Sequence, residues 1–175
     1  FDFAHCGYTL CILDSGADHA DLTDEYAAMP VEMKQVAAFF GKAVLNEVNE
    51  AEFYEKISDV RKACGDRAVL RAMHFFDENQ RVRLQVRALR NDNFAAFLNY
   101  VNASGSSSWV KLQNVTALGA VEHQEMAFTI ALCKKLLGGE GAVRVHGGGF
   151  AGTALAFVPK ERLEQFREGF EAVMG

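Results

Sequence analysis

The sequence predicts an α+β domain in which a small antiparallel sheet is covered by helices on one face. Strand-like runs lie near the two ends of the chain, at residues 8–13, 142–146 and 153–159. Helical spacing fills the stretch between the first run and the last two, a separation typical of the α+β class. The length of 175 residues and a 50% hydrophobic composition suit one compact globular domain, so we expect a single domain over residues 1–175.

Bulk composition argues against several classes of partner. The net charge is −5, with acidic and basic residues interleaved, so no nucleic-acid partner is expected. No apolar run approaches the roughly 18 residues that a membrane span needs, so no membrane partner is expected. The four cysteines show no CxxC spacing, which favours reduced thiols and a cytoplasmic location. Two Asn-x-Ser/Thr triplets, at Asn102 and Asn114, are interpreted as chance matches.

The first strand is predicted from the apolar run YTLCIL at residues 8–13. The turn cluster Asp14-Ser15-Gly16 ends it, and its composition predicts a buried strand. Residues 1–4 (FDFA) are a candidate for the end of a partner strand. Because the chain opens on Phe1 within apolar sequence, we expect further protein upstream.

The middle of the chain shows the three- and four-residue spacing of apolar positions that predicts helices. The first helix is expected to begin near Thr23-Asp24 and to end at Gly41, with Pro30 either kinking it or marking a later start. The cluster Ser104–Ser108 is interpreted as a loop or helix end. The other expected helices cover 49–57, 66–90, 94–102, 122–137 and 160–174.

A glycine-rich turn, HGGGFAG at residues 146–152, is the sharpest local signal. Gly147, Gly149 and Gly152 spell GxGxxG, but a dinucleotide fingerprint requires a following helix, and here a strand follows. No Gly-Lys-Ser/Thr occurs, so it is not a Walker loop. Two readings stay open, a structural hairpin and a backbone amide nest for an anion, and three consecutive glycines favour the second.

Four segments together resemble the galactokinase family, in its order and at about its spacing. LDSGADHADLTDEYAAM (13–29) resembles the strand end, His and Glu-Tyr that open the family's C-terminal half. ALRNDNFAAFLNYVNASGSS (88–107) resembles its Ala-Leu…Asp…Phe…Asn-x-Ser segment, and RVHGGGFAGTALAFVP (144–159) resembles the third signature of the wider GHMP kinase superfamily. RAMHFFDENQRV (71–82) resembles a family helix through Arg71, Ala72, His74, Glu78, Arg81 and Val82.

The resemblance implies a ferredoxin-like GHMP-kinase C-terminal domain, the C-terminal half of a two-domain kinase whose N-terminal domain is absent from this chain. The complete enzyme would transfer the γ-phosphoryl of ATP, with Mg²⁺, to the C1 hydroxyl of galactose. The implied partners are galactose or a related sugar and the missing N-terminal domain. That domain would carry the catalytic Asp and a phosphate loop, so we expect the fragment alone to be inactive and to hold no ATP or Mg²⁺.

The site residues that the resemblance implies for this chain bind the sugar or the nucleotide, and none of them is catalytic. The resemblance assigns Tyr26 to a sugar hydroxyl and the turn to the nucleotide cofactor, with no catalytic residue and no metal ligand here. The turn residues are Gly147, Gly148, Gly149, Phe150, Ala151 and Gly152.

The sequence leaves alternatives open. The domain could be a non-catalytic galactokinase-like module that senses sugar or nucleotide or binds a protein, or a sister kinase of another small alcohol. Departures from the family pattern are Ala151 for a glycine, His146 for a threonine, and Ser104-Gly105 for Ser-His.

Individual residues also have simpler readings. Tyr26 could pack with its hydroxyl in water, and His146 is expected as an exposed hairpin residue rather than a phosphate ligand. His74 and Glu78 are expected to contact Arg71 and Arg81 on the helix face rather than bind a metal. The Ser104–Ser108 cluster is expected to be structural because no base is placed beside it.

Overall fold

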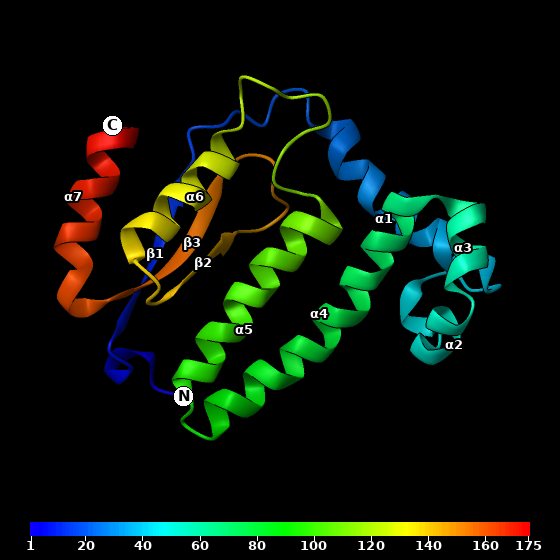
Figure 1. The fold of residues 1–175 in the computed structure, drawn as a ribbon, viewed down its shortest axis with the longest axis horizontal. Coiled ribbons are helices and arrows are strands. Elements are labelled where there is room, and N and C mark those ends of the chain that lie inside the picture. The colour runs from blue at the N-terminus through cyan, green and yellow to red at the C-terminus, as the bar shows by residue number, and fades with distance from the viewer.

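The computed structural model describes residues 1–175 and contains one three-stranded antiparallel sheet in the order β1-β3-β2 (Figure 1). The strands are β1 (Tyr8–Asp14), β2 (Ala142–Val145) and β3 (Thr153–Pro159). The central strand β3 pairs with the whole of β1, from Tyr8 opposite Pro159 to Asp14 opposite Thr153. The predicted α+β class with a small antiparallel sheet is therefore confirmed.

The helices are arranged around and beside this sheet. Figure 1 shows α6 and α7 beside the sheet, α5 between β2 and the long helix α4, and α1 to α3 gathered at the far end of α4. None of these helices is both long and apolar enough to cross a membrane. Their bounds are α1 (Thr23–Phe39), α2 (Glu50–Glu55), α3 (Ile57–Cys64), α4 (Asp66–Arg90), α5 (Phe94–Ser107), α6 (Glu125–Leu137) and α7 (Leu163–Met174).

Alternation along the strands divides the apolar side chains between two faces. One face packs into a core with α6 and α7, to which Val143, Ala156 and Phe166 contribute. On the other face, Ala142 and Phe157 pack against α5, so helices cover parts of both faces and not the single face that the sequence predicted. A third cluster joins α1, α3 and α4 and needs no sheet.

The outer edge of β2 is covered by α5. The side chain of Asn102 accepts a hydrogen bond from the Val143 N–H and donates one to the Gly141 carbonyl, both at 3.1 Å. Gly105 allows this approach, because a Cβ there would lie 2.9 Å from the Cβ of Arg144. The helix thus satisfies strand groups that would otherwise present an open edge.

The prediction of β1 as a buried strand is wrong. β1 lies at the sheet edge, and Leu10 and Ile12 are each 54% exposed because only the opposite side of the strand is covered by helices. Residues 1–4 are not a partner strand either. Phe3–His5 forms a 3₁₀ turn, and the side chain of Asp2 caps it.

Three helix predictions also need correction. Of the two interpretations of Ser104–Ser108, loop or helix end, the second is confirmed, because α5 continues past the predicted end at residue 102 to Ser107 and passes into a π-helical turn, Ser108–Leu112. The helix Ile57–Cys64 was not predicted, and α6 begins at Glu125 rather than Glu122. The helix α1 begins at Thr23 as expected and continues through Pro30.

Candidate functional site at the glycine turn

The turn His146–Gly152 connects β2 to β3 through residues in the left-handed region. Gly147, Gly149 and Gly152 have φ values of 71°, 85° and 79°. Phe150 also has a positive φ, 60°, which is uncommon for a bulky residue and costs free energy unless its surroundings support it. Ala151 is not among the positive-φ residues, so the alanine at this position needs no left-handed conformation.

Tyr26 meets the turn although the two are 123 positions apart in sequence. Its hydroxyl donates to the Gly149 carbonyl at 2.8 Å, and its ring packs edge-on to Phe150 at 5.5 Å between centroids. A Cβ on Gly148 would lie 3.0 Å from Cε1 of the Tyr26 ring. Burial raises the pKa of Tyr26, so the phenol stays protonated and donates this bond at neutral pH.

Asn114 and Ser15 support the turn from the side of the domain. The Phe150 N–H donates to the Asn114 carbonyl at 2.6 Å, and Asn114 Nδ2 donates to the Gly148 carbonyl at 3.3 Å. Ser15 donates to the Gly152 carbonyl from both its N–H, at 2.9 Å, and its hydroxyl, at 2.7 Å. Sequence reasoning missed both supports, because only the folded chain brings them to the turn.

The first half of the turn keeps unused donors. The N–H groups of Gly147, Gly148 and Gly149 make no hydrogen bond within the chain, and Gly147 and Gly148 are exposed. In contrast, Phe150 and Ala151 are 6% and 2% exposed, and their N–H groups bond to other turn or loop carbonyls. Of the predicted cofactor segment, the exposed Gly147 and Gly148 can therefore offer free backbone N–H groups to a ligand, whereas Gly149 is buried.

A pocket of about 300 Å³ adjoins the buried half of the turn. Phe150 forms part of its wall, with Val115 and Thr116 from the segment before α6 and Ala17 and Leu22 from the segment after β1. Larger pockets, such as one of about 420 Å³ next to Phe75 and Arg83, do not include the turn. The pocket places a partly apolar hollow directly behind the turn.

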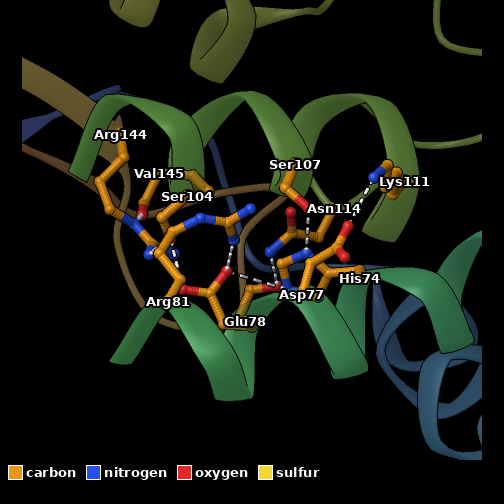
Figure 2. Close-up of polar contacts among 11 residues, drawn as sticks. His74, Asp77, Glu78, Arg81, Ser104, Ser107, Lys111, Asn114, Arg144 and Val145 are labelled. Carbon is orange, nitrogen blue, oxygen red and sulfur yellow. Dashed lines mark hydrogen bonds and ion pairs between the residues drawn. The ribbon is translucent and has the colours of Figure 1, made fainter. Parts of the chain in front are cut away.

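A polar network joins α4, α5 and the strand that leads into the turn (Figure 2). Glu78 accepts from the Ser104 hydroxyl at 2.7 Å and from Arg81 at 2.8 Å, and Arg144 donates to the Ser104 hydroxyl. Nε of Arg144 also donates to the Val145 carbonyl at 2.8 Å, at the last position of β2. Burial lowers the pKa of Arg144, while the Glu78 carboxylate opposes that shift.

The predicted contacts of His74 are partly corrected. Glu78 does lie 3.7 Å from His74 Nε2 and pairs with Arg81, as expected for a helix face. Arg71, however, points elsewhere and bonds to Glu32 and to the carbonyl of Leu112. The structure has no group of three His, Cys, Asp or Glu side chains that could hold a metal ion.

The structure also places a base beside the serine cluster, which the sequence did not reveal. Nδ1 of His74 lies 2.8 Å from the Ser107 hydroxyl. Because His74 and Ser107 are only 7% and 6% exposed, no substrate can reach this pair, and it links α4 to α5. His146 is exposed, as expected, and bonds to the Thr153 hydroxyl at 2.9 Å.

Comparisons with known proteins agree with this arrangement. The galactokinase of Actinobacillus pleuropneumoniae serotype 3 is 31% identical over 161 residues, and that of Glaesserella parasuis serovar 5 is 28% identical over 162 residues. These alignments cover 92% and 93% of this chain, which spans about 40% of the length of the curated relatives it matches. No family model matches the chain.

A solved structure gives the same result for the fold. The crystal structure of Lactococcus lactis galactokinase complexed with galactose superposes with a TM-score of 0.72 and 25% sequence identity. The match covers 96% of this chain and 42% of that one. In sequence and in fold, the chain is thus similar to sugar kinases. More narrowly, the relatives that it matches are galactokinases, the family that the sequence resembles, and the match covers about 40% of their length.

Proposed function

We propose that this chain is the C-terminal domain of a two-domain galactokinase. The complete protein would transfer the γ-phosphoryl of ATP to the C1 hydroxyl of galactose. One observation carries the proposal: Tyr26 and the glycine turn lie in contact, while the N–H groups of Gly147 to Gly149 remain free. A sugar contact and a phosphate contact can therefore lie side by side on one face of the domain.

The residues at the turn fit a nucleotide phosphate. Free backbone N–H groups at exposed glycines donate to anionic oxygens and need no reorganisation when a ligand binds. Phosphoryl transfer depends mainly on positioning and charge stabilisation, and bound Mg-ATP supplies the transferred group and the metal charge. In our proposal, the exposed Gly147 and Gly148 orient the phosphates from this side.

Tyr26 is proposed to orient the sugar. The Tyr26 hydroxyl donates its hydrogen to the Gly149 carbonyl, so its oxygen can accept a hydrogen bond from a sugar hydroxyl. His19 lies 3.2 Å from the same oxygen through Nδ1 and helps to fix it. The sugar and the turn are thus coupled through one phenol group.

The catalytic base and most nucleotide contacts are proposed to lie in an N-terminal domain that docks beside the turn. The similarity to proteins of which this chain covers about 40% supports this division. We therefore expect the isolated chain of residues 1–175 to phosphorylate no galactose. Turnover above background by the purified fragment would contradict the proposed division.

The direct test is galactose phosphorylation by the complete protein and its Tyr26→Phe variant. The loss of one net hydrogen bond, about 0.5–1.5 kcal/mol, should raise the KM for galactose about 2- to 12-fold. The matched control is Tyr54→Phe, because Tyr54 lies on α2 and makes no side-chain hydrogen bond. An unchanged KM for galactose would remove Tyr26 from the sugar site. Binding of galactose or ATP by the complete protein without any turnover would favour the sensing module instead.

A further inference from the structure

We propose that Asn114 is a positioning residue that holds the glycine turn in the shape that accepts phosphate. It precedes α6 in the chain and lies against the turn from inside the domain. The phosphate part of this inference rests on the proposed function. The mechanical part, that Asn114 supports the turn, rests only on the contacts described next.

Three contacts tie Asn114 to consecutive turn residues. Its carbonyl accepts from Phe150, its Nδ2 donates to the carbonyl of Gly148, and its backbone excludes any side chain at Gly149. A Cβ at Gly149 would lie 1.9 Å from the Asn114 carbonyl oxygen and 2.7 Å from Nδ2. Residues 148–150 of the turn are therefore all in direct contact with Asn114.

The side chain of Asn114 has no other role in the fold that would explain it. Asn114 is 1% exposed, and its Oδ1 is buried without a hydrogen-bond partner (Figure 2 shows the side chain beside the α4–α5 network). A buried acceptor without a donor is unfavourable, and a leucine of similar shape would avoid that cost. The bond from Nδ2 to Gly148 is thus the contact that distinguishes asparagine from an apolar residue here.

The burial of Asn114 also agrees with the interpretation of its Asn-x-Thr triplet as a chance match to the glycosylation pattern. A side chain 1% exposed cannot carry a glycan in the folded domain. Asn102, in the other triplet, ties the edge of β2 and has no contact with the turn. These two asparagines make the same kind of side-chain-to-backbone bonds in different places.

The support matters because the turn is strained at Phe150. A bulky residue at φ 60° relaxes toward negative φ unless neighbouring groups prevent it. Asn114 holds the residues on both sides of Gly149, so loss of its amide would free Gly148 to rotate. The exposed N–H groups of Gly147 and Gly148 would then lose their fixed positions, and affinity for phosphate would fall.

The test compares Asn114→Leu with Asn102→Ala in the complete protein. Asn114→Leu keeps the branched outline of the side chain with bulkier methyl groups and removes the unpaired acceptor, so the domain should still fold, and its thermal stability is measured first. We expect its KM for ATP to rise about tenfold, the loss of roughly one hydrogen bond to an anion-binding loop, and by a larger factor than its KM for galactose, which is coupled to the turn only through Tyr26. Hydrogen exchange at the Phe150 amide should accelerate. Asn102→Ala should lower stability and change neither the exchange at Phe150 nor the KM for ATP.

Failure of this inference and failure of the proposed function give different results. An Asn114→Leu protein with wild-type KM for ATP and wild-type exchange at Phe150 overturns the positioning role. If the wild-type complete protein phosphorylates no galactose, the proposed function fails, and the exchange rates alone then decide whether Asn114 supports the turn. Asn114→Ala provides a second variant if the leucine protein does not fold, with the same expected changes in the KM for ATP and in exchange at Phe150, and with a lower stability from the cavity that it leaves.

Discussion

Substitution of Gly149 by alanine tests the contact between the turn and Asn114 most directly. The added Cβ would lie 1.9 Å from the Asn114 carbonyl oxygen, a backbone atom that a side-chain rotation cannot move away. Gly149→Ala also forces an L side chain to adopt a φ of 85°. The matched control is Gly147→Ala, where φ is 71° and no atom lies within 4 Å of the added Cβ.

The two effects can be separated by magnitude. An L residue in the left-handed region costs about 1–2 kcal/mol, and both variants incur this cost. Only Gly149→Ala adds overpacking against a neighbour, about 1–3 kcal/mol. We therefore expect a loss of about 2–5 kcal/mol for Gly149→Ala and about 1–2 kcal/mol for Gly147→Ala.

Urea unfolding followed by circular dichroism measures both losses. With slopes of about 1–3 kcal/mol/M, the expected difference of about 1–3 kcal/mol separates the two midpoints by about 0.3–3 M. An unchanged slope would show that the difference lies in the folded state. Equal midpoints for the two variants would refute the close contact between Gly149 and Asn114, because the left-handed backbone alone would then account for both losses.

Two further predictions concern the helical part of the domain. Arg71→Ala should lower the free energy of unfolding in urea by about 3–5 kcal/mol, because it leaves Glu32 and the Leu112 carbonyl without their buried partner. The control is Lys62→Ala, at an exposed position, whose free energy of unfolding should stay within about 0.5 kcal/mol of wild type. For His74, burial lowers the pKa below the ordinary 6.5, so the unfolded chain binds this proton more readily as the pH falls below 6.5. The free energy of unfolding should therefore fall between pH 7 and pH 5, more steeply in wild type than in His74→Gln; parallel pH profiles for the two proteins would contradict a buried neutral His74.

Local sequence patterns predicted most elements because their signals lie within a few residues. The long helix Asp66–Arg90 and the strand Thr153–Pro159 have the predicted bounds, since periodic apolar residues and turn residues mark their ends. The same patterns failed at Ser104–Ser107. Small polar residues favour turns in isolation, but here they bond to Glu78 and His74 on α4 and allow β2 to approach, which stabilises a helix.

The site shows a similar division. The glycines and Tyr26 were predicted because their residue types follow a family pattern, although their binding roles stay predictions. Asn114 and Ser15 could not be predicted, because nothing in a short polar segment reveals which distant turn it will support. Exposure of β1 at the sheet edge was equally hidden, since an apolar run does not show how many neighbours a strand has.

Residue types at fixed local spacing were enough to predict the α+β class, the hairpin nature of the glycine turn and the resemblance to galactokinases. The folded chain was needed to show which glycine N–H groups remain free and that Tyr26 and Asn114 both contact the turn. Those facts depend on contacts between segments that lie up to 123 positions apart, and sequence spacing carries no information about which of them meet.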